Sequence, residues 1–390
     1  MDHETIMKEA RRVADELRSD ALERDQTKTF PARGIEVLKA SPLHGLMIAE
    51  HLGGLGGNVR DFVFVVEELA NGDPSVAQMY GVHVTAIDTV RGGAPTDVYE
   101  AFATDVIRDR LWVSNAQAEI GTKTNRDFRT TLQSVEGGWE MTGTKFYCTG
   151  SLAADYFVGG AATGDPAKPF LMYLAKVDQD GVEVVDDWTG MGQRGTASGT
   201  VEFKNAHVRA EHAFGLEGLI SATELAAVIL QGYFTAIFVG IARAALDDAI
   251  SYVNERARPW PTAGVDRAAE DPLVQLRVGD MHIRLLGAAA LLDRATHAML
   301  DAQANATEAT RGAASLAMAS AKVAATDAVL SITETMFLVC GSSATLEKYD
   351  FDRHWRNART LTLHDAVDHK RRIIGDAVLR DGWPAPGPWS

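Results

Sequence analysis

The residues best suited to chemistry in this sequence gather near its C-terminus, between Phe351 and Lys370. Three arginines recur there every third residue, so a helix would place them along one flank: Arg353, Arg356 and Arg359. Threonines then alternate with leucines up to His364, which predicts that the helix has ended and that a short extended loop presents this histidine. The segment also fits a solvated basic helix end, because arginine favours the last helical turn.

A second histidine that could take part in chemistry is His83. The signal Asp73-Pro74-Ser75 predicts the start of a helix, and the apolar stretch from Val76 to Thr89 continues it with His83 inside. Histidines on apolar helices are commonly hydrogen-bonded core residues. The sequence therefore leaves both a core role and a functional role open for His83.

Composition and charge narrow the class of protein. The chain has 390 residues, 46% of them hydrophobic and 23% charged, as in an ordinary soluble globular protein. Its formal net charge of −15 argues against nucleic acid or an anionic membrane as a partner. The polar N-terminus has no signal-peptide core, and no apolar run predicts a membrane span. We therefore expect a cytoplasmic protein.

Several common site motifs are missing from the sequence. The two cysteines, Cys148 and Cys340, do not make a disulfide framework. The histidines show no metal-ligand spacing such as H-E-x-x-H. Neither a Walker loop nor a G-x-G-x-x-G motif occurs, so a Rossmann dinucleotide domain is not expected.

The pattern of apolar residues divides the chain into three parts. Residues 1–110 show helical spacing with charges between the apolar positions. Residues 111–215 change to short strands separated by Gly, Pro and Asp turns, with a hairpin signal at Glu136-Gly137-Gly138. Residues 216–390 return to helix. We predict an α+β fold in which a compact β domain lies between helical regions.

The third part is predicted to hold long packed helices. Glu224 to Arg256 form one apolar helix, and Thr310 to Val339 form another that is rich in Ala and Ser. Between them, the helix that follows the cap Asp271 repeats apolar residues at spacings of four and three from Val274 to Met299. This heptad seam predicts lengthwise packing against neighbouring helices.

The order of these three parts resembles the acyl-CoA dehydrogenase superfamily, and the resemblance covers nearly the whole chain. It implies an N-terminal helical domain, a central β-barrel-like domain and a C-terminal four-helix bundle, assembled as a homotetramer. Four segments are similar to landmarks of the family: Glu50–Gly56 to "P-E-x-x-G-G-x-G", Gly143–Gly150 to "G-x-K-x-W-I-T-N-G", Gly190–Ser198 to "G-x-R-x-S-x-S", and Tyr252–Arg256 to "Y-x-x-x-R-x-Q-F-G".

The catalytic positions of a dehydrogenase are changed in this chain. Such an enzyme uses a glutamate in a "Y-E-G-T" motif to remove a proton from its substrate. The motif aligns with Leu363-His364-Asp365-Ala366, where a histidine takes the place of the glutamate. The alternative position of the base aligns near Leu230, and Glu224 lies about two turns away. A dehydrogenase would have to use Asp365 as an atypical base.

The C-terminal segment instead resembles the flavin-dependent monooxygenase branch typified by dibenzothiophene monooxygenase. The similar residues are Arg353–Thr360 and Thr362–Asp365, although Leu361 replaces the first histidine of the usual "T-H-T-L-H-D". The resemblance implies a two-component enzyme supplied with reduced flavin by a separate NAD(P)H-dependent flavin reductase. Dioxygen would form a C4a-(hydro)peroxyflavin that oxygenates a small substrate at an amine nitrogen, a sulfur or an aromatic carbon.

The resemblance also assigns roles to single residues. It makes His364 a proton donor or hydrogen-bond partner that titrates near neutrality, and gives His83 a positioning role. It places five residues around the flavin ring: Asn115, Thr149, Ser151, Trp188 and Ser198. For each of these, ordinary strand-end hydrogen bonding is the alternative. At the flavin phosphate, partly from a neighbouring subunit, it implies Arg256, Arg258, Ser342 and Ser343.

The segments that bind adenine in the family differ here, at Arg256–Trp260 and Leu338–Ala344. The adenine-side glutamine is lost while Arg and Ser are present, which favours FMN over FAD. Three functions stay open at this point. They are a two-component flavin monooxygenase, an acyl-CoA dehydrogenase with an atypical base, and a non-catalytic protein that uses the flavin fold for binding.

Overall fold

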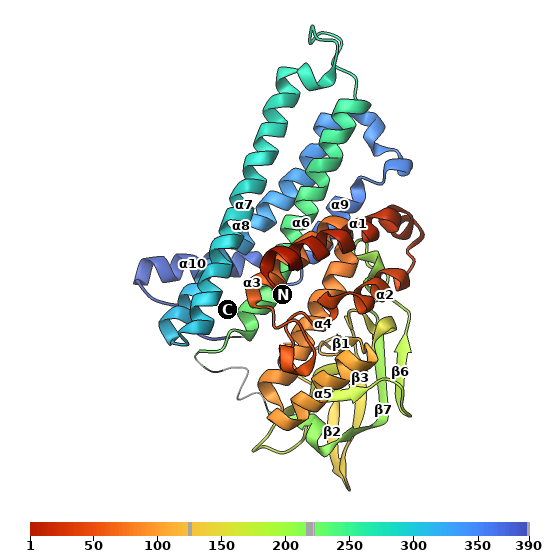
Figure 1. Ribbon diagram of the computed structural model, residues 1–390, viewed down its shortest axis with the longest axis vertical. Coiled ribbons are helices and arrows are strands. Elements are labelled where there is room, and N and C mark those ends of the chain that lie inside the picture. The colour runs from red at the N-terminus through yellow and green to blue at the C-terminus, as the bar shows by residue number, and fades with distance from the viewer. Residues whose placement is uncertain (124–126, 216–220, 222, 388–390) are drawn as a thin grey trace.

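The computed structural model describes residues 1–123, 127–215, 221 and 223–387. Its N-terminal part is helical, as predicted (Figure 1). Local signals define the helix starts: Asn58 caps α3 in a capping box with Asp61, and Asp73 caps α4 with Pro74 in the first turn. The α-helices are α1 (His3–Thr27), α2 (Ala32–Ala40), α3 (Val59–Gly72), α4 (Pro74–Gly93) and α5 (Thr96–Asp109).

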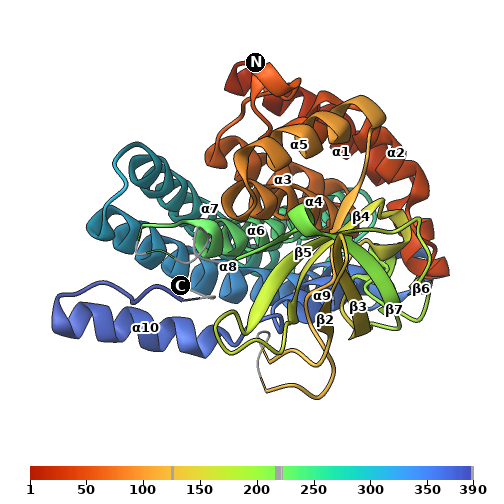
Figure 2. The same cartoon turned by 90° about the horizontal axis from the view of Figure 1, so that it is seen from below.

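The middle of the chain forms one curled sheet in the order β6-β7-β3-β2-β4-β5-β8, with β1 added in parallel beside β4 (Figure 2). The predicted hairpin is confirmed, because β2 pairs antiparallel with β3 across the Glu136–Gly137 turn. The strands are β1 (Val113–Asn115), β2 (Thr131–Val135), β3 (Gly138–Lys145), β4 (Tyr156–Ala162), β5 (Phe170–Lys176), β6 (Val182–Val185), β7 (Thr200–Arg209) and β8 (Ala213–Phe214).

Three long helices dominate the C-terminal part, and shorter helices follow them (Figure 1). The predicted seam of α7 is buried from Met281 to Met299, which confirms lengthwise packing against α6 and α8. The helix α10 packs on α8 as a shorter fourth member. The helices are α6 (Ala226–Glu255), α7 (Pro272–Ala304), α8 (Glu308–Cys340), α9 (Asp352–Leu361) and α10 (Val367–Arg380).

Two of these helices, α6 and α8, are long and apolar enough to cross a membrane by length and composition. Their apolar segments are nevertheless 78% and 50% buried inside the protein. Their hydrophobicity therefore fits a role in the helical core, where α6 packs against α3, α4 and α8.

The helical parts meet where α4 crosses α6. A Cβ atom at Gly81 would lie 2.5 Å from the ring of Tyr233, so the glycine permits this close approach. The same helix α4 also contacts β1. It therefore borders both the sheet and the C-terminal helices, and one of its faces lines the cavity between them.

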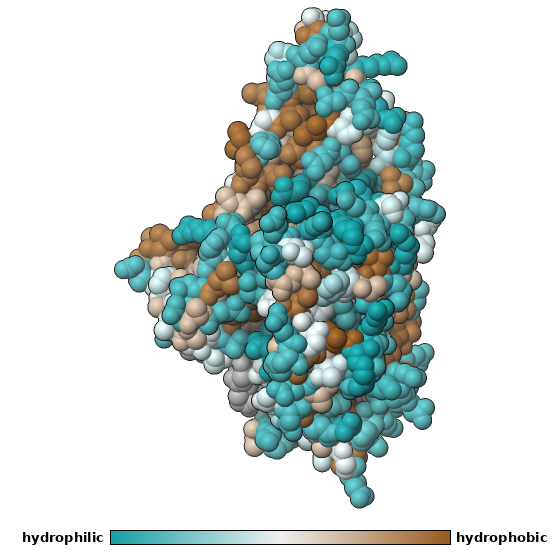
Figure 3. Space-filling model, in the orientation of Figure 1, coloured by the Kyte–Doolittle hydropathy of each residue, from teal (hydrophilic) through white to brown (hydrophobic). Residues whose placement is uncertain are grey.

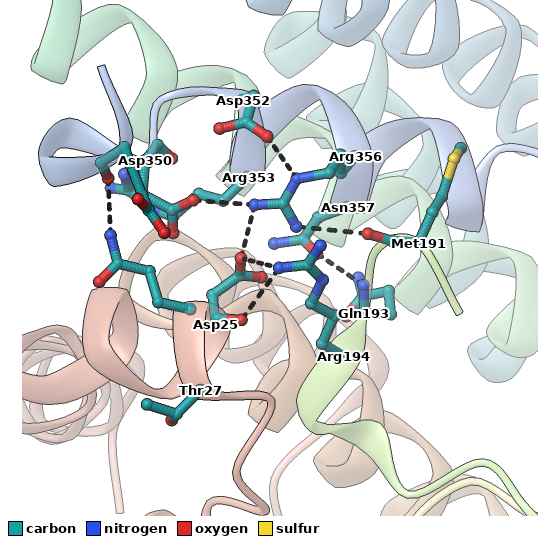
Figure 4. A network of polar contacts seen from close by, with 12 residues as sticks. Asp25, Thr27, Met191, Gln193, Arg194, Asp350, Asp352, Arg353, Arg356 and Asn357 are labelled. Carbon is teal, nitrogen blue, oxygen red and sulfur yellow. Dashed lines mark hydrogen bonds and ion pairs between the residues drawn. The ribbon is translucent and has the colours of Figure 1, made fainter. Parts of the chain in front are cut away.

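The predicted arginine cluster on α9 is a buried ion network, so the interpretation as a solvated helix end is wrong for its central member (Figure 4). Arg356 binds Asp25 of α1 at 2.6 Å, Asp350 at 2.9 Å and Asp352 at 2.6 Å. Its guanidinium also donates to the carbonyl of Met191. The network thus joins α9 to the first helix and to the loop before β7.

A backbone contact reinforces this junction. Asn357 accepts a hydrogen bond of 2.6 Å from the backbone N of Gln193 (Figure 4). A Cβ atom at Gly192 would lie 2.1 Å from the carbonyl oxygen of Arg356, so only glycine fits there. Beyond α9 the chain forms a turn at residues 362–365, with Thr362 in helical conformation. The extended loop predicted before His364 is therefore wrong, because the helical hydrogen bonding continues one residue past Leu361.

Candidate active site

A cavity of about 980 Å³ lies between α4, the curled sheet, the start of α6 and the turn after α9. One side is apolar, with Ile229, Leu230 and Phe234 of α6 facing Leu361 and Leu363. The other side carries amides and hydroxyls from α4, β1 and the loops around β3 and β7. Such a concave, mostly apolar space with a few convergent polar groups is typical of a small-molecule site.

Five of the residues predicted from the sequence meet in this cavity: Asn115, Thr149, Trp188, Ser198 and His364. They come from four separate segments, namely β1, the loop after β3, the loop before β7 and the turn after α9. The fold therefore brings together side chains that are far apart in the sequence.

Three hydroxyl groups line up along the polar wall. Thr149 Oγ1 lies 2.9 Å from Ser198 Oγ, which lies 2.8 Å from Thr196 Oγ1. Thr196 donates at 2.9 Å to the carbonyl oxygen of Gln193, to which the Trp188 indole N–H also donates at 2.9 Å. At the other end, the side-chain amide of Gln78 donates to Thr149 at 3.4 Å.

His364 lies on the opposite, apolar side of the cavity. Its ring packs on that of Phe234 with a centroid separation of 4.0 Å, and 34% of its side chain is exposed. Enclosure by the protein and the positive charge of Lys322 lower the pKa of His364 to about 4. This lowered pKa favours an uncharged imidazole at neutral pH and runs against the expected titration near neutrality.

Asp365 does not have the surroundings of a catalytic base. It is hydrogen-bonded to Lys322, which also binds Gln231, and it lies 3.6 Å from Lys370. Burial alone would raise the pKa of Asp365, but the two lysines outweigh that effect and hold the pKa below its usual value. A carboxylate paired in this way is a poor proton acceptor.

His83 is a core residue in this structure. Its Nδ1 accepts a hydrogen bond of 3.1 Å from the backbone N of Val113, so the proton sits on Nε2, which donates at 3.1 Å to the carbonyl of His44. The ring is fully buried and stacks on Trp112 at 4.4 Å. His83 does not line the cavity, and its contacts support a core role rather than a functional role.

Other residues of α4 face the cavity. Gln78, Val82, Thr85 and Thr89 recur at spacings of four, three and four and share one face of the helix. Gln78 was not predicted from the sequence, because only His83 was considered as a functional residue of this helix. Three polar residues on one face of an apolar helix were the available signal.

Ser151 supports the site without lining it. Its hydroxyl donates at 2.8 Å to the carbonyl of Ala197, and the residue is 3% exposed. This bond holds the loop after β3 against the loop before β7. The predicted contact between Ser151 and a flavin therefore does not follow from the geometry of this chain.

The residues expected at the flavin phosphate lie at the far end of α6. From Ile229 to Arg256 the helix extends about 40 Å at about 1.5 Å per residue. Arg256 and Arg258 are exposed there, and the guanidinium of Arg256 lies 5.8 Å from the ring centroid of Tyr349. Also exposed, just beyond α8, are Ser342 and Ser343. None of the four lines the cavity of the same chain.

Several polar atoms along the cavity are buried and make no hydrogen bond within the described residues. They belong to Gln78 (Oε1), Asn115 (Oδ1), Thr360 (Oγ1) and Gln193 (Oε1 and Nε2). Each such group costs about 1–3 kcal/mol when it is left unpaired. A ligand that carries both donors and acceptors would remove this cost, which is the expected property of a binding site.

Comparison with known proteins agrees with this geometry. Residues 1–95 match the family described as "Acyl-CoA dehydrogenase, N-terminal domain", and residues 233–369 match "Acyl-CoA dehydrogenase, C-terminal domain". Dibenzothiophene monooxygenase of Rhodococcus qingshengii is 33% identical over 392 residues, covering 97% of this chain and 94% of that protein. The probable FMNH2-dependent monooxygenase SfnC of Pseudomonas putida is 32% identical over 386 residues, covering 98% and 96%.

Among solved structures, FMN-bound TdsC from Paenibacillus sp. A11-2 superposes with a TM-score of 0.94 at 30% identity, over 99% of this chain and 100% of that one. The protein belongs to the acyl-CoA dehydrogenase family. Within this family it lies in the flavin-dependent monooxygenase branch and is an oxidoreductase. The predicted fold and the predicted resemblance are thereby confirmed.

Proposed function

We propose that this protein is a two-component monooxygenase that takes reduced FMN from a separate NAD(P)H-dependent flavin reductase. With dioxygen it would oxygenate a small substrate at an amine nitrogen, a sulfur or an aromatic carbon. The observation that carries the proposal is the cavity. Some of its buried amide atoms lack partners among the described residues, and His364 takes the place of a catalytic glutamate.

The polar wall fits the isoalloxazine ring of a flavin. This ring carries alternating donors and acceptors, and the unpaired amides of Asn115 and Gln193 offer both kinds of group. Trp188 lines the same wall. When bound, reduced flavin supplies the electrons that activate dioxygen. FMN, which the sequence favours over FAD, is also the flavin named for SfnC and for the TdsC complex.

His364 is placed to act on the substrate side. As an uncharged imidazole it holds one N–H and one lone pair at neutral pH, so it can orient a polar group without bringing a charge into an apolar space. The apolar neighbours Phe234, Leu361 and Leu363 keep water away from the reacting atoms. They also favour a substrate that is largely apolar.

The two alternative functions are less well supported. Among the carboxylates of the described cavity lining, Asp88 pairs with Arg91 at 2.7 Å, and Glu224 accepts a hydrogen bond from the backbone N of Leu225. Asp365 is held by lysines. None is placed as a dehydrogenase base. A non-catalytic binding protein is disfavoured because the relatives that this chain resembles over nearly its full length are monooxygenases.

We further propose a homotetramer in which a neighbouring subunit supplies the phosphate contacts. Arg256, Arg258, Ser342 and Ser343 are too far from the cavity of their own chain, yet they are exposed and polar. Apolar side chains also cover one side of α7 and the end of α10 (Figure 3), among them Leu273, Leu276, Ile283, Leu286, Val378 and Leu379. Such a surface is expected to be covered by further copies of the chain.

Mass measurement under native conditions tests the assembly, and the expected mass is four times that of the chain. Replacing Arg256 and Arg258 together by alanine should weaken binding of reduced FMN about tenfold, through the loss of charged hydrogen bonds, and leave the assembly intact. A monomer that binds FMN normally would contradict the proposal. We expect the enzyme to work in the cytoplasm, as the composition indicates.

The reaction itself is tested by rapid mixing of the protein and reduced FMN with oxygenated buffer. A transient absorbance distinct from both reduced and oxidised FMN is expected, and it should decay more slowly with the protein than without it. In His364→Ala the transient should decay faster and release more hydrogen peroxide. Immediate oxidised FMN, together with bleaching of a flavin-loaded protein by an acyl-CoA, would instead indicate a dehydrogenase.

A further inference from the structure

A buried lysine of α8 lies behind the apolar side of the cavity. Lys322 is 2% exposed and is not one of the residues that line this cavity. Its ammonium group donates to the carboxylate of Asp365 and to the side-chain carbonyl of Gln231. It also lies 5.3 Å from the ring centroid of Phe234. A single cation therefore joins α8 to α6 and to the turn after α9.

The contacts of Lys322 end on the two groups that surround the imidazole of His364. Phe234 packs on this imidazole with a centroid separation of 4.0 Å, and Gln231 lies three residues before Phe234 on the same side of α6. Asp365 is the next residue in the chain, and its carboxylate oxygen lies 4.0 Å from Nδ1 of His364. Lys322 thus holds both the ring that packs on the imidazole and the carboxylate beside it.

Stability alone is a weak reason for a lysine in this place. Burial lowers the pKa of Lys322 to about 8, although Asp365 acts in the opposite direction. A buried ion pair contributes little to folding on average, because the loss of hydration offsets the attraction between the charges. The position of the pair, directly behind one side of the cavity, indicates an effect on that side.

We propose that Lys322 is a positioning residue for His364, on which it acts through Asp365 and Phe234. The inference rests on the proposed function, in which His364 orients a polar group on the substrate side. Because Lys322 binds the carboxylate of Asp365, this carboxylate does not draw a proton to Nδ1 of the neighbouring imidazole. The imidazole then stays packed on Phe234 at the edge of the cavity.

The charged groups around His364 give the sign of the expected pH effect. Burial is the main cause of its lowered pKa; Lys322 of α8 and Lys370 of α10 lower it further, and Asp365 raises it. The helix α6 contributes an aromatic ring without charge. Removing Lys322 takes away a cation and leaves Asp365 to attract a proton, so the pKa of His364 should rise. The charged residues elsewhere in the described cavity lining are Asp88, Glu224 and Arg311.

The direct test is Lys322→Met, with the titration of His364 followed by NMR of histidine-labelled protein and assigned with His364→Gln. The pKa of His364 should rise from about 4 toward its ordinary value of 6.5. The double variant Lys322→Met/Asp365→Asn also removes the carboxylate, so it should bring the pKa back toward the wild-type value. A lysine that only stabilised the fold would not produce this reversal.

The matched control is Lys145→Met. Lys145 is equally buried and pairs with Glu119 at 2.7 Å, but it belongs to the sheet. Its loss should lower the stability of the protein and leave the pKa of His364 unchanged. If Lys322→Met does not fold, Lys322→Gln removes the same charge while keeping an amide donor for Asp365, and it should move the pKa in the same direction.

The link to the reaction is tested by mixing protein and reduced FMN with oxygenated buffer at pH 6 and pH 8. In Lys322→Met a larger part of His364 carries a proton at pH 6. The ratio of the decay rates of the transient absorbance at pH 6 and pH 8 should therefore be larger in Lys322→Met than in the wild type. In the double variant this ratio should return toward the wild-type value.

The outcomes separate the inference from the proposed function. An unchanged pKa of His364 in Lys322→Met, or a raised pKa that Asp365→Asn does not reverse, would overturn the inference alone, because the titration needs no flavin. A pKa that moves while the ratio of decay rates does not would overturn it as well. A wild-type protein that gives no transient with reduced FMN would overturn the proposed function.

Discussion

Two groups of buried polar residues lie on either side of the loop before β7, and they differ in how completely they are paired. Around Arg356, the carboxylates of Asp25, Asp350 and Asp352 and the carbonyl of Met191 accept four hydrogen bonds from the guanidinium, which has five N–H donors (Figure 4). On the cavity side, the amides of Asn115 and Gln193 have buried atoms without partners in the described part of the chain.

This difference in pairing separates polar groups that stabilise the fold from polar groups that are available to bind a ligand. A largely paired ion network fixes the relative positions of its elements and leaves few groups for a small molecule, although Asp350 Oδ2 is a buried atom without a partner among the described residues. Unpaired amides lower the stability of the protein without a ligand, and they increase its affinity for a ligand that pairs with them. Residue type alone does not distinguish the two groups, since both are polar and both are buried.

The largest effect is expected from breaking the ion network around Arg356. Arg356→Met leaves Asp25 and Asp350 buried without their main cation, so the free energy of unfolding should fall by about 3–5 kcal/mol. Chemical denaturation monitored by circular dichroism measures it. The control is Arg371→Met, which removes an exposed pair with Asp327 and should cost at most about 1 kcal/mol. Equal losses in both variants would contradict the distinction.

A smaller effect of opposite sign is expected on the cavity side. Gln193→Met removes two unpaired amide atoms, so the protein without flavin should become more stable, by about 1 kcal/mol. Binding of reduced FMN, measured by anaerobic titration, should weaken about tenfold. Gln231→Met is the control. Its amide nitrogen also lacks a partner among the described residues, but its side-chain carbonyl accepts from the buried Lys322, so its loss should destabilise the protein. A destabilised Gln193→Met that binds FMN normally would place Gln193 in the first group.

The smallest effect concerns pH. The folded-state pKa of His364, about 4, lies below the ordinary value of 6.5, so protonation favours the unfolded chain. The stability contributed by the neutral ring is present above pH 6.5 and is lost as the pH falls toward 4. Between these values His364→Gln should lose stability less steeply than the wild type, by under about 1 kcal/mol per pH unit. An equally steep loss of stability in His364→Gln and the wild type over this range would contradict the prediction.

Much of the fold could be predicted from the sequence because its signals are local. The hairpin at Glu136–Gly138, the cap Asp271 and the seam of α7 each depend on residues close together in the chain, and each is observed. The cavity-lining side chains that motif resemblance picked out, such as Thr149 and Ser198, also meet as expected.

The predictions from the sequence were wrong or incomplete where the role of a residue depends on how its helix is oriented or on a distant part of the chain. His83 and Gln78 lie on one helix, and only the rotation of α4 against α6 decides which of them faces the cavity. The lowered pKa of His364 depends on burial and then on Lys322, which lies 42 residues earlier in the chain. Neither fact is contained in the spacing of residues within a single segment.

The close contact at Gly192 has a consequence for how this cavity can change. Its backbone lies directly against the carbonyl of Arg356, so the loop before β7 and α9 are held together at this point. Most of the hydroxyl wall belongs to this loop and His364 follows α9, so the contact helps to set the distance across the cavity. A change in the width of the substrate space would then come from side chains of the apolar side, such as Phe234 and Leu363.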